Sequence, residues 1–233
     1  MKKVLITGGT GAIGEELVKT FSKSYDVYFT FNTQKEKATQ IAKKYKAKIA
    51  DACSASDFDI IINNAAIDIF GDLALTVDDE IMQMHFDVNV MLPFKIIKQN
   101  LPHMIKQKWG RIINISSVCG IKPSTHVISY NVSKAALNML TKSIAKEYAA
   151  NGITCNAVAP STLDEKGMGW EAIKFYGQTP KEFKEEYDAC VNAVPAGRLG
   201  KIDEVAAAVE FLASDRASFI NGVVLPVDGG LTI

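Results

Sequence analysis

The sequence has few cysteines and no arrangement of them that builds a site. Its four cysteines, Cys53, Cys119, Cys155 and Cys190, are scattered, and no C-x-x-C pair occurs. We therefore expect buried free thiols in a reducing compartment rather than a disulfide framework. The three histidines are equally dispersed, so the sequence predicts no metal site.

Long hydrophobic runs and an excess of one charge are also missing. No stretch of about 18 apolar residues occurs, so we expect no membrane span. Gly8 stops the first apolar run early, which argues against a signal peptide and favours a cytoplasmic location. Lysine plus arginine and aspartate plus glutamate number 26 each, giving zero net charge. Neither nucleic acid nor an acidic membrane surface is therefore expected as a partner.

What the sequence does contain is an alternation of short apolar runs with longer helical patterns. The predicted strands are 4–7, 27–31, 60–63, 111–115, 154–158 and 223–227. The predicted helices are 13–21, 35–45, 78–106 with an interruption near Pro93, 129–149 and 203–212. Apolar strands that alternate with helices indicate a doubly wound, Rossmann-type α/β fold, with a parallel sheet covered on both faces. We expect residues 1–233 to form a single domain, since no linker or repeat is visible.

A glycine-rich segment, Thr7 to Gly14, separates the first predicted strand from the first predicted helix. Its glycines satisfy the pattern G-x-G-x-x-G. Glycines allow the backbone to approach a pyrophosphate, and the helix N-terminus offers free N–H groups and partial positive charge. A plain tight turn has the same signature, but the strand–turn–helix context favours a dinucleotide site. Its expected contacts are Gly8, Thr10, Gly11, Ala12, Ile13 and Gly14.

The end of the second predicted strand bears on the choice of cofactor. Many dinucleotide folds place an acidic residue there to hold the ribose hydroxyls. Here Asn32, Thr33 and Lys35 follow the strand, and they could meet a 2′-phosphate. This pattern favours NADP(H), with NAD(H) possible; the alternative is a solvated loop without a role.

A second candidate site combines a tyrosine, a lysine and a serine. Tyr130 and Lys134 are four residues apart in a predicted helix and share one face. An adjacent ammonium favours the phenolate, so the tyrosine pKa, ordinarily near ~10, is expected to fall by about one to three units. A phenol tuned in this way can exchange a proton with a substrate oxygen. The spacing alone is common by chance, but Ser117 follows a predicted central strand at the edge where open α/β sheets bind ligands.

Together these motifs resemble the short-chain dehydrogenases/reductases over essentially the whole chain. The matching segments, in the order of that family, are the glycine loop, Asn63-Asn64-Ala65-Ala66, Asn89, Ser117, Tyr130, Lys134, Asn156 to Pro160, Gly197 to Gly200 and Val227 to Gly230. The chain is most similar in appearance to 3-oxoacyl-acyl-carrier-protein reductases. The resemblance implies the sheet order 3-2-1-4-5-6-7 and a homotetramer or homodimer.

The resemblance also implies a role for each matching residue. Tyr130 would be the general acid/base, while Lys134 would lower the tyrosine pKa and hold the nicotinamide ribose. Ser117 would orient and polarise the substrate carbonyl. Asn89 would support a proton-relay water near Lys134. Further cofactor contacts would come from Asn63, Ala65, Pro160, Ser161 and, at the adenine edge, Asp51.

The chain departs from the pattern of this family at several positions. Ala12, Ala66 and Ser161 each replace a glycine, and Glu165 stands where a threonine often contacts the carboxamide. Residues 50–59 take the place of a full helix. Because a parallel crossover needs about a dozen residues, we expect a loop or single turn there, and hence a shortened or absent helix between strands 3 and 4. One sheet face near the adenine side is then thinly covered, unless a loop or partner chain lies over it.

Residues 162–194 carry five aromatic side chains and are expected to form a substrate lid of short helices, although plain helix packing is slightly favoured as the explanation of any single aromatic. The sequence as a whole predicts an NAD(P)(H)-dependent oxidoreductase that interconverts a carbonyl and a secondary alcohol of a small molecule. Two alternatives stay open. One is a non-catalytic NAD(P)-binding regulator, and the other is an epimerase or dehydratase that keeps its cofactor bound. The substrate itself is set by pocket shape, which the sequence does not display.

Overall fold

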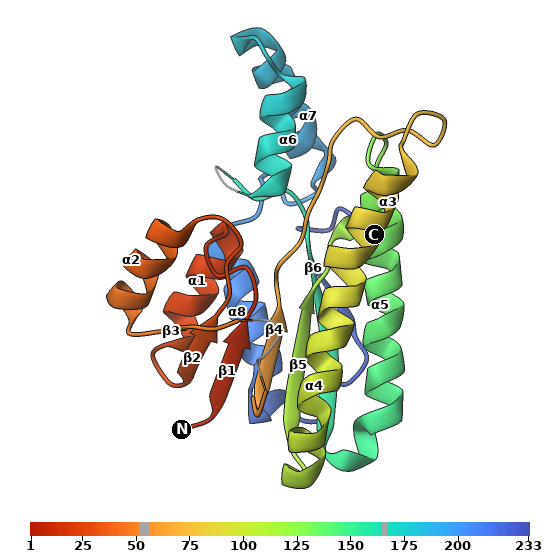
Figure 1. Cartoon of the computed structure of the whole chain (residues 1–233). Coiled ribbons are helices and arrows are strands. Elements are labelled where there is room, and N and C mark those ends of the chain that lie inside the picture. The colour runs from red at the N-terminus through yellow and green to blue at the C-terminus, as the bar shows by residue number, and fades with distance from the viewer. Residues whose placement is uncertain (52–55, 165–166) are drawn as a thin grey trace.

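The computed structural model describes residues 1–51, 56–164 and 167–233. Its centre is a seven-stranded parallel sheet with the order β3-β2-β1-β4-β5-β6-β7, which confirms the predicted topology (Figure 1). The strands are β1 (Lys3–Ile6), β2 (Asp26–Phe29), β3 (Lys48–Ile49), β4 (Ile60–Asn63), β5 (Gly110–Ile115), β6 (Ile153–Pro160) and β7 (Val224–Val227).

Helices cover both faces of this sheet, as expected for a doubly wound fold (Figure 1). They are α1 (Ala12–Phe21), α2 (Lys35–Tyr45), α3 (Asp79–Phe86), α4 (Leu92–Gln107), α5 (Ile128–Tyr148), α6 (Met168–Tyr176), α7 (Pro180–Ala193) and α8 (Ile202–Ala213). Helices α1 and α8 pack on one face, and α4 and α5 on the other. No helix in the described ranges is long and apolar enough to cross a membrane.

The central strands are apolar because both of their faces are buried. In β4, Ile60 and Ile62 belong to the core on the α1 and α8 side, whereas Ile61 belongs to the core on the α4 and α5 side. All three are 0% exposed. This two-sided burial explains why the strands read as continuous hydrophobic runs rather than as alternating patterns.

The predicted long helix 78–106 is three elements rather than one. A π-helical turn, Asp87–Met91, separates α3 from α4, and in it the Leu92 N–H bonds to the carbonyl of Asp87, five residues earlier. Pro93 lies in the first turn of α4 and has no N–H to offer a regular α-helical ladder. The expected break near Pro93 therefore exists, but the interruption lies slightly earlier, at residues 87–91. It places Asn89 in a π-helical turn, a feature common at functional sites.

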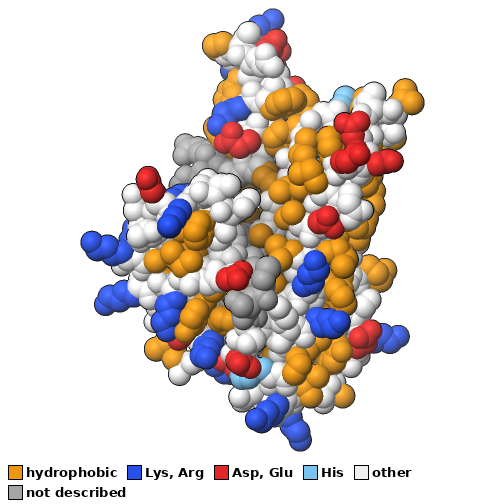
Figure 2. All heavy atoms as spheres, viewed as in Figure 1, with side chains coloured by type: hydrophobic (Ala, Val, Ile, Leu, Met, Phe, Trp, Pro, Cys, Tyr) orange, Lys and Arg blue, Asp and Glu red, His pale blue; other side chains and the backbone are white. Residues whose placement is uncertain are grey.

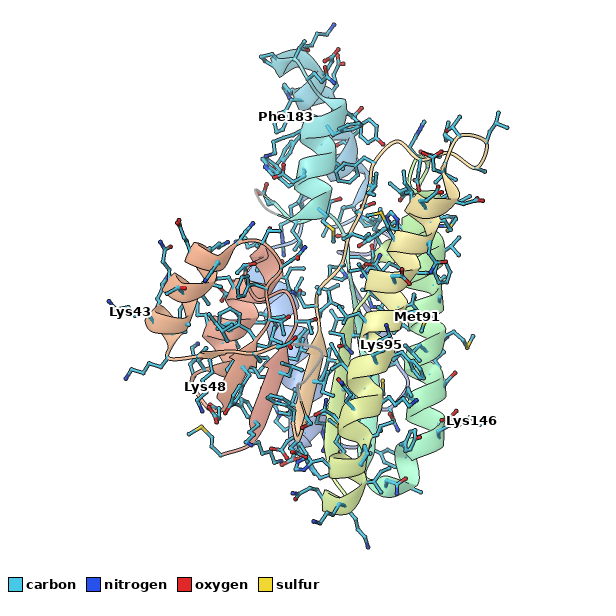
Figure 3. The ribbon with its side chains drawn as sticks, in the orientation of Figure 1. Lys43, Lys48, Met91, Lys95, Lys146 and Phe183 are labelled. Carbon is cyan, nitrogen blue, oxygen red and sulfur yellow. The ribbon has the colours of Figure 1, made fainter. Side chains whose placement is uncertain are left out.

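The described part of the crossover between β3 and β4 places an aromatic side chain, Phe58, against the sheet. Residues 52–55 lie outside the described part of the chain, and the described residues beside them form no helix. Phe58 is 4% exposed and packs edge-on against Tyr28, with ring centroids 5.1 Å apart. Lys48, labelled in Figure 3, bonds the Tyr28 hydroxyl at 3.0 Å. Phe58 belongs to the crossover itself and thus covers part of the sheet face that the short crossover would otherwise leave thin.

The segment expected as a lid folds into α6 and α7, which project beyond the carboxyl ends of the strands (Figure 1). Trp170 of α6 packs edge-on against Phe183 and Tyr187 of α7, with centroids 5.5 and 6.0 Å apart; Figure 3 labels Phe183. These aromatics therefore hold the two helices together. Glu165, which the sequence comparison placed near the carboxamide, lies outside the described residues.

Candidate active site

A cleft of about 730 Å³ opens at the carboxyl edge of the sheet. Its walls come from the loops after β1, β2, β4, β5 and β6 and from the start of α6. Figure 2 shows hydrophobic side chains gathered where the projecting helices meet the body of the molecule. The cleft has the volume of an ordinary cofactor or ligand site. The expected site residues that line it are Gly8, Thr10, Gly11, Ala12, Ile13, Gly14, Asn32, Asp51, Ala65, Ser117, Tyr130, Lys134, Pro160 and Ser161.

Four expected site residues lie off the cleft wall: Thr33, Lys35, Asn63 and Asn89. Thr33 and Lys35 are exposed at the start of α2. Asn63 is 2% exposed, and its Nδ2 donates to Asn114 Oδ1 at 2.8 Å. Because Asn63 still belongs to β4, its side chain is engaged by the neighbouring strand β5. The next residue, Asn64, reaches the cleft in its place.

The glycine loop leaves no room for side chains at two of its positions. A Cβ on Gly14 would lie 2.1 Å from the carbonyl oxygen of Gly8, and one on Gly9 would lie 2.4 Å from the Phe29 ring. Gly11 precedes α1 and gives it no side-chain cap, so the first N–H groups of the helix stay available. This close-packed turn with free donors fits the pyrophosphate of a dinucleotide.

Asn64 holds the glycine loop in place, a role that sequence reasoning did not assign. Its Nδ2 donates to the carbonyl oxygens of Thr7 and Gly8, at 2.9 and 3.1 Å. In return, Thr7 Oγ1 accepts the N–H groups of Asn64 and Ala65, at 3.0 and 2.9 Å. The consecutive pair Asn63-Asn64 was the only signal in the sequence for this role, but it did not show which asparagine contacts the loop. Asn63 bonds Asn114, whereas Asn64 bonds Thr7 and Gly8.

Lys37 is a second residue that sequence reasoning missed. Its Nζ donates to the carbonyl oxygen of Thr10 at 2.8 Å and pairs with Glu15 at 3.3 Å. The contact joins α2 to the glycine loop, so no local pattern in the sequence could indicate it. It brings a cation to the rim of the loop.

Ser117, Tyr130 and Lys134 come together deep in the cleft, 8%, 6% and 1% exposed. The side chain of Ser117 hydrogen-bonds that of Tyr130. Lys134 Nζ lies 5.3 Å from the centroid of the Tyr130 ring and donates to the carbonyl oxygen of Ile115 at 2.9 Å. Ser117 Oγ also accepts the Cys119 N–H at 3.1 Å. The single proton of that hydroxyl can therefore be donated either to the Tyr130 oxygen or to a substrate oxygen placed beside it.

Buried polar contacts fix the register of α5 against the sheet. Asn114 Nδ2 donates to Thr141 Oγ1 at 2.8 Å, and Ser116 Oγ donates to Asn138 Oδ1 at 2.6 Å. These bonds join the end of β5 to one face of the helix that carries Tyr130. Because buried hydrogen bonds of defined geometry specify one packing of the helix on the strand, they hold the phenol at the mouth of the sheet.

The charge state of Tyr130 differs from the sequence-based expectation. Burial raises the pKa of its phenol well above the ordinary value, nearby Asp68 and Cys119 raise it further, and the Ser117 hydrogen bond lowers it only in part. Burial also lowers the pKa of Lys134 to about 8. The expected lowering of the tyrosine pKa by Lys134 is therefore wrong for the protein alone, because burial raises that pKa and the effect that opposes burial comes from Ser117 rather than from Lys134. At neutral pH the phenol is protonated.

Asn89 acts through its side chain on a loop and a helix. Its Oδ1 accepts the Ile67 N–H at 2.9 Å, and its Nδ2 donates to the Ile67 carbonyl and to Ser133 Oγ, both at 3.0 Å. Ser133 in turn donates to the carbonyl oxygen of Tyr130 at 2.9 Å. Asn89 thus connects the loop after β4 with the turn of α5 that carries the phenol.

Comparisons with known proteins agree with this geometry. Residues 4–232 match the family described as enoyl-(acyl carrier protein) reductase. The chain is 33% identical to a 3-oxoacyl-acyl-carrier-protein reductase of Rickettsia conorii, over 99% of this chain and 96% of that protein.

Two solved structures extend the comparison to the fold. A gluconate 5-dehydrogenase from Burkholderia cenocepacia in complex with NADP and tartrate aligns with TM-score 0.86 and 27% identity, covering 99% of this chain and 95% of that one. An aldohexose dehydrogenase from Thermoplasma acidophilum aligns with TM-score 0.81 and 30% identity, covering 99% and 94%. The chain belongs to the short-chain dehydrogenase/reductase family and is an NAD(P)-dependent oxidoreductase acting on carbonyl and secondary alcohol groups.

Proposed function

We propose that this protein is a carbonyl reductase, similar to the 3-oxoacyl-acyl-carrier-protein reductases, that uses NADPH in preference to NADH. The single observation that carries the proposal is the convergence of Ser117, Tyr130 and Lys134 in the cleft that the glycine loop also lines. A protonated Tyr130 supports the reducing direction, because a phenol with a raised pKa is the form that gives a proton to a carbonyl oxygen.

In the proposed reaction the protein positions the substrate and manages the proton. The nicotinamide ring, when bound, supplies a hydride to the carbonyl carbon. Ser117 donates a hydrogen bond to the carbonyl oxygen, where negative charge develops. Tyr130 donates its proton to that oxygen. Lys134, buried beside the phenol, holds the nicotinamide ribose. It also favours reprotonation of Tyr130 after the phenol has given up its proton.

The preference for NADPH rests on the adenosine end of the cleft. Asn32 lines it, and residues 30–35, which follow β2, include no acidic side chain to repel a 2′-phosphate there. Thr33 and Lys35 lie just beyond Asn32 and are exposed. Lys37 adds a cation beside the glycine loop. Asp51, on the same wall, is proposed to meet the adenine edge.

Further parts of the proposal concern regions outside the reacting groups. Residues 162–194 act as a lid, since the start of α6 already borders the cleft. Asn63 contributes to the cofactor pocket through its backbone, and Asn89 supports a proton-relay water near Lys134. We further propose that residues 1–233 fold as one domain and work in the cytoplasm as a homotetramer or homodimer.

Two other functions on the same fold make different predictions. A non-catalytic NAD(P)-binding regulator has no use for a phenol held against a serine and a lysine, and it would not oxidise NADPH. An epimerase or dehydratase would turn over its substrate without net consumption of NADPH. Following the absorbance of the reduced cofactor during a ketone screen therefore separates all three.

The decisive variant is Tyr130→Phe, which removes the transferable proton and leaves the ring. We expect the rate of NADPH oxidation to fall by about 100-fold or more, since general acid catalysis contributes roughly that factor. NADPH affinity, measured by isothermal titration calorimetry, should change by less than about threefold. Tyr148→Phe, about five turns further along the same helix, is the matched control and should keep full activity. Full activity in Tyr130→Phe would overturn the proposed mechanism.

A further inference from the structure

Among the described residues that line the cleft, Asp68 carries a carboxyl group close to the reacting residues to which the proposed mechanism gives no role. Asp68 lines the cleft together with Tyr130 and Lys134. Its side chain is half-buried, and its Oδ1 is shielded from solvent without a hydrogen-bond partner in the described part of the chain. A shielded carboxylate oxygen without a donor is energetically costly. Because Asp68 lies beside the reacting residues, its Oδ1 favours a ligand that supplies a hydrogen-bond donor to this oxygen.

The backbone on both sides of Asp68 is held by fully buried side chains. Asn89 binds both the N–H and the carbonyl of Ile67, at 2.9 and 3.0 Å. His85 Nε2 accepts the N–H of Ile69 at 3.3 Å, while Nδ1 of that ring lies 2.8 Å from the carbonyl oxygen of Ile81. Asn89 and His85 are both 0% exposed. Asp68 therefore reaches the cleft from a backbone segment whose neighbouring residues, Ile67 and Ile69, are both held by buried hydrogen bonds.

The same loop is anchored to the projecting helices one turn further on. Phe70 packs on Phe175 of α6, with ring centroids 5.7 Å apart. The N–H groups of Gly71 and Asp72 both donate to the carbonyl oxygen of His126, at 2.9 and 3.0 Å. Asp68 thus lies between the reacting groups and the proposed lid, on the wall that a substrate rather than the adenosine of a cofactor would meet.

The charges around Asp68 define what it can accept. Burial and the neighbouring carboxylate of Asp72 raise the pKa of Asp68 to about 6, and Lys134 opposes the shift. Asp72 is itself engaged, because its Oδ2 accepts the Ser129 N–H at 3.0 Å, and Lys134 donates to Ile115. At neutral pH the cleft therefore presents an ionised acceptor backed by a second negative charge. A substrate carboxylate would be repelled there, whereas a neutral hydroxyl can donate a hydrogen bond without bringing a second cation next to Lys134.

We propose that Asp68 selects substrates carrying an uncharged hydroxyl group near the reacting carbonyl, by accepting a hydrogen bond from that hydroxyl. This inference rests on the proposed carbonyl reduction and narrows its substrate class to hydroxylated ketones, against carboxylated or purely hydrocarbon ones. A site built to bind a hydroxyl rejects the analogue that lacks it, because its polar group is then left unpaired.

The test compares four ring ketones as probes: cyclohexanone, 2-hydroxycyclohexanone, 4-hydroxycyclohexanone and 4-oxocyclohexanecarboxylate. The values of kcat/KM are measured with NADPH at pH 8, where Asp68 is ionised. We expect at least one hydroxyketone to exceed cyclohexanone by about tenfold or more, the lower range for a hydrogen bond to a charged group. The carboxylate should fall below cyclohexanone.

Asp68→Asn is expected to reduce the hydroxyketone preference to within about threefold and to raise the relative kcat/KM of the carboxylate. Asp79→Asn, an exposed residue in the first turn of α3, makes the same charge change and should preserve the parental ratios. Asp68→Ser serves the same purpose if the asparagine variant does not fold.

The possible results separate the two proposals. Reduction of all four ketones without a hydroxyl preference, or a preference that survives Asp68→Asn, overturns the role of Asp68 and leaves carbonyl reduction intact. Failure of the parent protein to oxidise NADPH with any of the probes counts against carbonyl reduction itself, and the role of Asp68 falls with it.

Discussion

At the scale of single residues, burial dominates the electrostatics of the site. Tyr130 and Lys134 share one helix face, as their spacing predicts, yet the cleft shifts their pKa values in opposite directions. Desolvation disfavours the charged form of each, so the phenol keeps its proton and the ammonium holds its proton less tightly. Their arrangement is suited to donating a proton from Tyr130 to a substrate oxygen.

The lowered pKa of Lys134 has a consequence for stability. Between pH 8 and the ordinary value of 10.5, the unfolded chain binds the proton of this lysine more readily than the folded protein. The contribution of the group to stability is therefore present above pH 10.5 and is lost as pH falls through about 8. At pH 7 the buried ammonium costs about 3 kcal/mol.

We therefore expect Lys134→Met to abolish turnover without lowering the melting temperature at pH 7, because the buried charge is removed while the aliphatic stem is kept. Differential scanning calorimetry at pH 7 and pH 10 checks this, with the advantage of the variant shrinking at the higher pH. A melting temperature well below that of the parent at pH 7 would contradict the assignment of Lys134 as a destabilising buried cation.

At the scale of elements, the site is positioned by segments that depart from regular helices and strands. The π-helical turn Asp87–Met91 places Asn89 where it bonds Ile67 and Ser133 at once. The glycine loop turns tightly because Gly14 packs against the carbonyl of Gly8. The short β3–β4 crossover depends on Phe58, which covers the sheet and whose N–H donates to Asn100 Oδ1 at 3.0 Å. In the π-helical turn, the glycine loop and the short crossover alike, a specific contact stabilises backbone that departs from regular helix or turn geometry.

Phe58→Ala is expected to lower the free energy of unfolding by about 3–5 kcal/mol, the usual cost of removing a buried phenylalanine. Phe219→Ala, at a fully exposed position, is the matched control and should change it by less than about 0.5 kcal/mol. Urea unfolding followed by circular dichroism measures both. A loss below about 1 kcal/mol in the first variant would show that another segment covers this face.

At the scale of the whole molecule, the cleft is lined by residues from the loops after several strands and from the first of the projecting helices, α6. Its walls combine residues from the loop after β1 with residues from α5 and α6, which are far apart in the sequence. A ligand that fills it binds the folded protein only and stabilises the molecule by mass action. The thermal shift on adding nucleotide therefore reports on the assembled cleft.

NADPH at about 100 times its dissociation constant is expected to raise the melting temperature by roughly 5–10 °C, and the same concentration of NADH by less. Comparing the melting-temperature shifts caused by adenosine 2′,5′-bisphosphate and adenosine 5′-monophosphate isolates the contribution of the 2′-phosphate. The bisphosphate should give the larger shift. A larger shift with NADH would contradict the assignment of Asn32 and its neighbours to a 2′-phosphate site.

Local patterns in the sequence were sufficient for the fold class and for much of the site. The order of the strands in the sheet came from the family resemblance, and the short strand β3 was not among the strands predicted from local patterns. The bounds of α2 and β4 were predicted to the residue, because an amphipathic helix and a fully buried strand each have a local signature. The glycine loop, Ser117, Tyr130 and Lys134 were identified from motifs. The second strand ended two residues early, at Phe29, since Phe31 turns to the cleft wall instead of continuing the ladder.

The sequence by itself thus determined the doubly wound type of fold and most of the side chains that meet at the carboxyl edge of the sheet, because periodicity and motif order are properties of the chain. Only the tertiary structure decided the protonated state of Tyr130, the exchange of Asn63 for Asn64 on the cleft wall and the place of Asp68 beside Lys134. These depend on burial and on distances between residues far apart in the chain, which packing alone sets.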